Sequence, residues 1–151
     1  MTVRFEMFAT GGASTDTLWS VVGDPWRLPE WTDVESVANV TPDPPQVGTT
    51  VETVEAGTTR MWEIFTLSSR LIEMRTQTER GGIAVGFRVV RDARGGSRLV
   101  LAAGLEPSGV AGTVRARLLD VPALQRRMDR WAANALRVAA AGDGQGHTHE
   151  S

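Results

Sequence analysis

The chain has 151 residues, of which 41% are hydrophobic and 23% are charged, and its net charge is −2 at pH 7. This size and balance predict one globular domain with its own core, rather than two domains. Because cysteine is absent, disulfides and thiolate metal sites are excluded, and we expect a cytoplasmic protein. The first residues do not have the pattern of a secretory signal, and no apolar run reaches the ~18 residues of a membrane span.

The missing residue types exclude much familiar catalytic chemistry. The sequence has no lysine and no tyrosine, and its histidines are His147 and His149, near the C-terminal end. A Schiff base needs a lysine, and a Ser-His-Asp or Cys-His arrangement needs an imidazole inside the fold. Asp and Glu therefore remain as the ordinary proton-transfer groups, while Arg, Ser, Thr, Asn, Trp and backbone amides can orient a ligand or stabilise charge.

The N-terminal segment predicts one strand and two short helices. Apolar and polar residues alternate over 2–10, which is typical of a strand, and two glycines end it. Ser14 or Thr15 can cap the helix that follows, and Gly23-Asp24-Pro25 stops it. A second short helical piece covers 26–31.

The middle of the chain predicts a series of strands separated by turn residues. The predicted strands are 34–40, 49–55, 59–67, 71–79, 83–91 and 97–105. Their connections are short, and a parallel crossover would need roughly a dozen residues, so antiparallel hairpins are expected. We therefore predict a meander of these strands, joined to the first strand and apolar on one face.

The C-terminal part predicts the helix that covers this apolar face. Its apolar residues recur at steps of three and four, as in an amphipathic helix: Leu124, Met128, Trp131, Ala135 and Val138. Pro122 either lies in the first turn of this helix or interrupts a longer helix that begins near residue 110. We set the domain at 1–141 and expect a disordered tail over 142–151.

Several short motifs, in this order, resemble those of a known superfamily. They are Leu18-Trp19, Gly23-Asp24-Pro25, Pro29-Glu30-Trp31, Val47-Gly48-Thr49 and Gly95-Gly96-Ser97-Arg98-Leu99. Over about residues 2–140 the chain resembles the START-like or Bet v 1-like (SRPBCC) superfamily, and within it the small bacterial polyketide cyclase/dehydrase and lipid-transport group. The resemblance implies an α+β helix-grip fold, in which a curved seven-stranded antiparallel sheet wraps around a long C-terminal helix.

The resemblance also implies an internal cavity for a hydrophobic small molecule, such as a polyketide, an aromatic compound or a lipid. A bent sheet cannot lie flush along a whole helix, which independently favours a gap between them. In the family's register, Trp26 and Trp31 stand near the entrance. The lining residues are then Val51, Thr53, Trp62, Ile64, Met74, Thr76, Val85, Phe87, Leu99, Leu101, Met128 and Trp131. For the tryptophans, ordinary core packing is the competing interpretation.

Two charged residues are candidates for chemistry in such a cavity, although neither is assigned as catalytic. Glu55 points inward in the family's register, and buried carboxyl groups are common proton-transfer groups. Its place beside the turn at 56–57 favours a solvated side chain instead. Arg60 could bind a carboxylate or enolate oxygen through its fork of donors, or form an ion pair at the surface.

The sequence leaves three functions open. A cyclase- or dehydratase-like enzyme would hold a reactive chain in a productive conformer, and a carrier would shield a hydrophobic molecule from water. A co-chaperone-like domain would instead have a filled interior and an exposed apolar patch. We expect no cofactor, no metal and no nucleic-acid partner, because the C-terminal arginines are interspersed with acids and the His147-Thr148-His149 tail offers too few ligands. The chain is expected to be a monomer or a homodimer.

Overall fold

The computed structural model describes residues 2–107 and 109–150, with side chains at all of these positions except 110, 117, 118 and 143–150. The first elements are β1 (Val3–Gly11), α1 (Thr15–Val22), the 3-10 turn η1 (Pro25–Arg27) and α2 (Leu28–Trp31). Ser14 is the N-cap of α1, because its hydroxyl accepts a hydrogen bond from the backbone N–H of Thr17 at 3.1 Å. The predicted strand, cap and short helices are confirmed.

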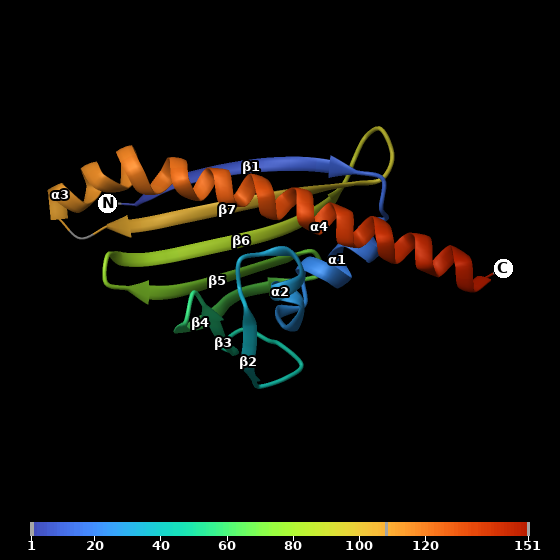
Figure 1. Cartoon of the computed structure of the whole chain (residues 1–151), viewed down its shortest axis with the longest axis horizontal. Coiled ribbons are helices and arrows are strands. Elements are labelled where there is room, and N and C mark those ends of the chain that lie inside the picture. The colour runs from blue at the N-terminus through green and yellow to red at the C-terminus, as the bar shows by residue number, and fades with distance from the viewer. Residues whose placement is uncertain (1, 108, 151) are drawn as a thin grey trace.

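Six further strands complete a single antiparallel sheet. They are β2 (Ser36–Thr41), β3 (Thr50–Glu55), β4 (Thr58–Ser68), β5 (Leu71–Thr78), β6 (Gly81–Arg91) and β7 (Ser97–Pro107). The strand order is β1-β7-β6-β5-β4-β3-β2, so the first strand pairs with the last (Figure 1). The predicted meander is confirmed, and each strand boundary lies within two residues of its prediction.

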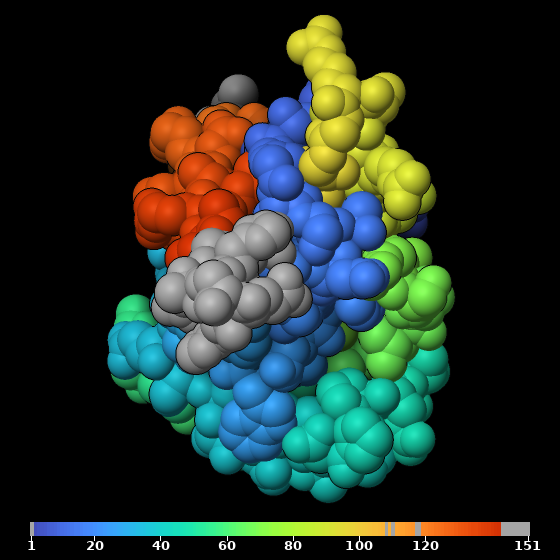
Figure 2. All heavy atoms as spheres, turned by 90° about the vertical axis from the view of Figure 1, so that its right-hand side faces the viewer, coloured from blue at the N-terminus to red at the C-terminus, as the bar shows by residue number. Residues whose placement is uncertain are grey.

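Bulges and a close chain crossing shape this sheet. The register shifts between Val37 and Asn39 and between Ile64 and Thr66, and such bulges increase twist and bend the strand. At the β6–β7 hairpin Gly96 has a φ of 76°, and a Cβ there would overlap the carbonyl oxygen of Gly11. Only glycine fits at this crossing. Figure 2 shows the hairpin, in yellow, projecting from the body of the molecule.

One long helical segment crosses a face of the sheet (Figure 1). It consists of α3 (Gly109–Arg115), the π turn η2 (Ala116–Asp120) and α4 (Val121–Glu150). The wider turn comes directly before Pro122, whose ring crowds the preceding turn and whose nitrogen cannot donate. Of the two alternatives for Pro122, the structure therefore has the longer helix. We expected a disordered tail over 142–151; the structure has helix as far as Glu150, and the domain boundary at 141 stays a prediction.

The core lies between the sheet and the helices. Along β6 and β7 the buried hydrophobic residues are two positions apart, namely Val85, Phe87, Val89, Leu99, Leu101, Ala103 and Leu105. These residues share the face covered by α4, whose Met128 is fully buried. Trp31 of α2 is also fully buried and meets Phe87 edge to face, with 4.8 Å between ring centroids. The α+β helix-grip architecture is confirmed. Within the described residues, no helix combines the length and apolar character that crossing a membrane requires.

Candidate functional site

The space between the sheet and the long helix is filled at one end of the molecule and open at the other. Near α2, Trp31, Leu101 and Met128 are fully buried and belong to one core cluster. At the opposite end, where α3 and the β5–β6 hairpin lie in Figure 1, an opening of about 850 Å³ remains. We call it the α4 opening, and it is the candidate site.

The α4 opening has apolar walls and a charged rim. Ile83 and Leu105 pair across β6 and β7 on the α4 face, and both line the opening together with Leu124 of α4. The rim contains the charged residues Arg60, Glu79, Arg80, Glu106, Asp120 and Arg127. A site of this composition can take a molecule with an apolar body and a polar end.

Arg60 is the rim residue whose charge is best placed to meet a ligand. It pairs with the buried Thr53 across β3 and β4, which puts it on the α4 face, and it is half-buried. Among the side chains that the structure describes, no acidic group forms an ion pair with Arg60. A guanidinium with free donors can bind an anionic oxygen through charge-assisted hydrogen bonds.

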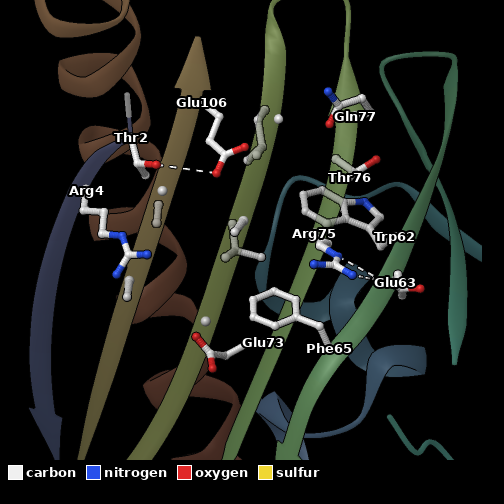
Figure 3. A pocket seen from close by; sticks show the side chains of 18 of the residues that line it. Thr2, Arg4, Trp62, Glu63, Phe65, Glu73, Arg75, Thr76, Gln77 and Glu106 are labelled. Atoms are coloured by element: carbon white, nitrogen blue, oxygen red, sulfur yellow. Dashed lines mark hydrogen bonds and ion pairs between the residues drawn. The ribbon is translucent and has the colours of Figure 1, made fainter. Parts of the chain in front are cut away.

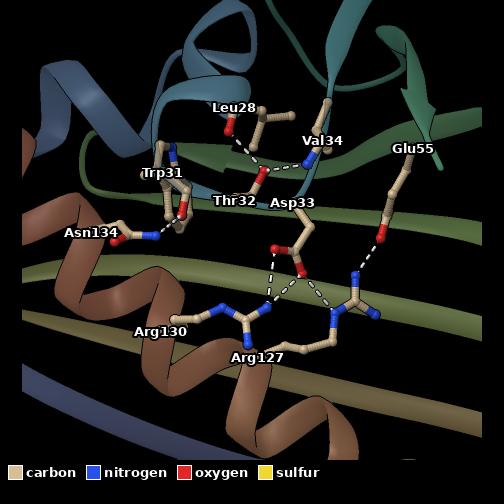
Figure 4. A network of polar contacts seen from close by, with 9 residues as sticks. All are labelled: Leu28, Trp31, Thr32, Asp33, Val34, Glu55, Arg127, Arg130 and Asn134. Carbon is tan, nitrogen blue, oxygen red and sulfur yellow. Dashed lines mark hydrogen bonds and ion pairs between the residues drawn. The ribbon is translucent and has the colours of Figure 1, made fainter.

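Arg127 is the centre of a polar network beside the opening (Figure 4). Its Nε donates to Asp33 Oδ2 at 2.7 Å, and its NH2 group donates to Glu55. Arg130 donates to the two oxygens of Asp33 at 3.1 and 3.3 Å. The Arg127 guanidinium also lies 5.3 Å from the ring centroid of Trp131. These contacts connect α4 to the end of β3 and to the segment that follows α2.

This network holds Asp33 and Arg127 in their charged forms. Burial raises the pKa of Asp33, but hydrogen bonds from Arg127 and Arg130 outweigh it, so the pKa lies below its usual value. Burial lowers the pKa of Arg127, and the hydrogen bond with Asp33 and the charge of Glu55 more than compensate, so that pKa is raised. Both groups are therefore charged at neutral pH, and Glu55 has a structural partner.

A second ion pair lies across the α4 opening itself. Arg80 in the β5–β6 hairpin is 3.4 Å from Asp120 in η2, and the Arg80 side chain is 64% exposed. Gly81, the next residue, has a φ of 122°, and a Cβ there would overlap the carbonyl oxygen of Glu106. The hairpin thus has a fixed path along the sheet, but its contact with η2 is a solvated ion pair, which contributes roughly 0–1 kcal/mol.

The structure brings few of the predicted site residues to this opening. Thr76 and Arg60 line it. Ten predicted lining residues lie instead within the filled core: Val51, Thr53, Ile64, Met74, Val85, Phe87, Leu99, Leu101, Met128 and Trp131. Trp62 is half-buried, and its indole N–H donates to Thr53 Oγ1 at 3.2 Å.

The two tryptophans expected at the entrance do not line the opening. Trp31 fills the interior beside Phe87, and Trp26 is 44% exposed, with its indole N–H donating to Asp43 at 2.9 Å. Sequence reasoning missed Ile83, Asp120 and Arg127 as site residues. The alternation that put Val85 and Phe87 on the covered face extends to Ile83, so its position could have been found.

A second hollow lies on the opposite face of the sheet. It is a trough of about 1000 Å³. Three predicted residues border it although strand pairing puts their side chains on the α4 face, namely Trp62, Thr76 and Val85. In Figure 3 the helix lies behind the sheet, so this trough faces away from α4. Within the described part of the chain no three His, Cys, Asp or Glu residues group as a metal site; the side chains of His147 and His149 lie outside it.

Comparison with known proteins shows the same fold in solved structures. No protein-family model and no curated protein matches the sequence. StfQ, a di-domain ARO/CYC from the steffimycin biosynthetic pathway, has a TM-score of 0.71 at 13% identity, over 95% of this chain and 52% of StfQ. This chain thus spans about half the length of StfQ.

Two further solved structures are matched over nearly their whole length. A norcoclaurine synthase point mutant from Thalictrum, in complex with a transition-state analogue, has a TM-score of 0.64 at 15% identity, over 91% of this chain and 96% of the synthase. Ara h 8.0201 has a TM-score of 0.66 at 16% identity, over 93% of this chain and 99% of its own. At these identities the similarity establishes the fold alone.

Proposed function

We propose that this chain binds a hydrophobic small molecule with an anionic oxygen in the α4 opening. The apolar body of the ligand lies against Ile83, Leu105 and Leu124, and the anionic oxygen accepts hydrogen bonds from Arg60. The observation that carries the proposal is a half-buried arginine, without an ion-pair partner among the described side chains, at the rim of an apolar opening between sheet and helix. The cytoplasmic location expected from the cysteine-free composition is part of the same proposal.

The ligand class follows from the composition of the opening. Its apolar walls favour an aromatic, polyketide or acyl body, because removing such a surface from water is favourable. Its charged groups lie at the rim, and threonine and glutamine side chains also line it, so several polar groups are available to orient one end of a ligand. The fold shared with StfQ, an ARO/CYC, and with norcoclaurine synthase supports a small-molecule ligand.

A cyclase- or dehydratase-like reaction is the second candidate, supported by the similarity to StfQ. Such a reaction needs a free acid or base within reach of the ligand. Glu55 is bound by Arg127 and Asp120 by Arg80, while Glu79 and Glu106 of the rim are exposed to solvent. Among the described residues, no carboxylate at the opening is both buried and unpaired. Binding and shielding of the ligand is therefore the function that the contacts support best.

The binding of 1-anilinonaphthalene-8-sulfonate tests the proposal, because this probe combines an aromatic body with a sulfonate. We expect saturable binding that increases the fluorescence of the probe. Arg60→Met keeps an aliphatic stem and removes the charge, so we expect the dissociation constant to rise about tenfold, the effect of losing ~1.4 kcal/mol. Arg94→Met, which changes an exposed arginine of the β6–β7 turn, is the matched control and should leave binding unchanged.

Two results would contradict the proposal: absence of saturable binding, or equal affinity in the wild type and Arg60→Met. The enzyme and carrier alternatives are then separated by mass spectrometry after incubation with candidate polyketide and acyl compounds. Binding without a product across the panel favours the carrier. A product that disappears in Glu55→Ala, in a variant that still binds the probe, favours the enzyme.

A further inference from the structure

The face of the sheet that points away from α4 carries its charges in rows that run across the strands. One row contains Arg4, Gly104, Ala84 and Arg75 on β1, β7, β6 and β5. The neighbouring row contains Glu6, Ala102, Gly86 and Glu73 on the same four strands. Each row thus has small residues in the middle and like charges at both ends, and the two rows have opposite signs.

The small residues form a low floor between two charged walls (Figure 3). A Cβ added to Gly86 would lie 3.3 Å from Glu73 Cγ, and one added to Gly104 would lie 3.8 Å from Arg4 Cγ. The stems of the wall residues therefore lean across the floor. The result is the trough described above, whose floor is half-buried at Ala84, Ala102 and Gly104 and buried at Gly86.

The charges of these walls are largely unpaired within the chain. Among the described residues, no ion pair involves Arg4, Glu6 or Glu73. Arg75 is the exception, because it contacts Glu63 at 2.7 Å, and its side chain is 62% exposed. Unpaired charges that alternate in sign along a surface are available to a partner with the opposite order.

The opposite order is present on a second copy of the same face. We propose that two copies of this chain associate face to face through this trough, about a two-fold axis that runs across the strands between the two rows. That operation places the positive row of one copy on the negative row of the other. Arg4 then faces the partner's Glu6, and Arg75 faces the partner's Glu73.

The outer rows fit the same arrangement. Arg88 lies one row beyond the negative row, and Glu106 lies one row beyond the positive row, at the other end of the trough. The two-fold axis exchanges these outer rows, so it brings Arg88 toward the partner's Glu106. Successive rows are about 7 Å apart, since same-face residues of a strand are two residues apart. Stacked sheets pack about 10 Å apart, and the glycine and alanine floor permits that approach. An interface of this kind is isologous, since the same patch serves both copies.

The dimer leaves the α4 opening on its outer side and does not involve Arg60, and Glu106 is the charged residue that both hollows share. Substitution of Arg60 therefore tests the ligand separately from the dimer. The experiment is sedimentation velocity of the full chain over a range of protein concentrations at low and high salt. We expect a monomer–dimer equilibrium that shifts to monomer as salt increases, because exposed charge pairs are screened. Arg4→Glu should abolish the dimer by placing carboxylates on carboxylates.

The double variant R4E/E6R provides the decisive control, because it exchanges the two charges and restores complementarity between copies. We expect it to dimerise again, while Arg94→Glu should dimerise like the wild type. Circular dichroism verifies that each variant folds. If Arg4→Glu does not fold, Glu73→Arg on the opposite wall serves as the test variant in its place. Three results would each overturn the proposal. The wild type could be monomeric at all concentrations, or the dimer could persist in both Arg4→Glu and Glu73→Arg. The third is a double variant that folds but stays monomeric.

Discussion

Replacing Arg127 by methionine tests the network that fixes α4 to the edge of the sheet. The guanidinium binds Asp33 at 2.7 Å and Glu55, and lies 5.3 Å from the ring of Trp131. Hydrogen bonds to charged groups contribute about 1.5–3 kcal/mol when buried, whereas exposed pairs contribute about 0.2–1 kcal/mol. The Arg127 and Asp33 side chains are 37% and 33% exposed, and Arg130 still binds Asp33 after the change. We therefore expect a loss of about 1–2 kcal/mol.

The pH dependence of this loss is the sharper part of the prediction. Because the pKa of Asp33 is lowered in the folded state, its carboxylate contributes stability above the pKa of an unfolded aspartate, ~3.9. That contribution disappears as the pH falls through the lower, folded pKa. The difference between the wild type and Arg127→Met should therefore be full at neutral pH and shrink in acid below about pH 4.

Urea denaturation followed by tryptophan fluorescence measures this difference at neutral pH and through the acid range. Arg126→Met, which changes the exposed neighbouring arginine, is the control and should have the stability of the wild type. In a thermal scan, the Arg127→Met loss corresponds to roughly 2–4 °C per kcal/mol for a domain of this size. The reasoning would be refuted if Arg127→Met and Arg126→Met were equally stable at neutral pH. It would also be refuted if the difference in unfolding free energy between the wild type and Arg127→Met stayed the same in acid.

Three further changes test the packing and the rim. Trp31→Ala should cost about 3–5 kcal/mol in urea denaturation, since the side chain is fully buried against Phe87; a loss below about 1 kcal/mol would show that this end is not filled. Gly96→Ala should cost at least about 1–3 kcal/mol, because its Cβ would overlap the backbone of Gly11, and unchanged thermal stability would contradict the crossing. Asp120→Asn should cost less than about 1 kcal/mol, because its partner Arg80 is mostly exposed; a larger loss would mean that the pair fixes the hairpin.

Local signals explain why the strands and short helices could be predicted. Each hairpin has its own turn residues, and alternation along β6 and β7 assigns Phe87 and Leu101 to the covered face before any contact is known. The capping hydroxyl of Ser14 is likewise a local feature. Both kinds of signal depend on residues close together in the sequence, so no tertiary information is needed.

The candidate site depends on contacts that no local pattern contains. Arg127 meets Asp33 from 94 residues away, and nothing in the sequence around either residue specifies the pair. Trp31 was expected near an entrance, and the structure uses its side chain to fill the interior beside Phe87. The opening proposed as the site lies at the β5–β6 hairpin instead. Which side chain fills a gap is decided by tertiary packing.

The binding position of a hydrophobic anion is the most direct test of the account. An NMR titration of the isotope-labelled chain with 1-anilinonaphthalene-8-sulfonate measures which backbone amides shift. We predict that the shifts cluster around the α4 opening, in Thr78–Ile83 and in Asp120–Arg127, and that they weaken in Arg60→Met. Shifts confined to the opposite face of the sheet, around Gly86 and Ala102, or no saturable shifts at all, would contradict the proposed site.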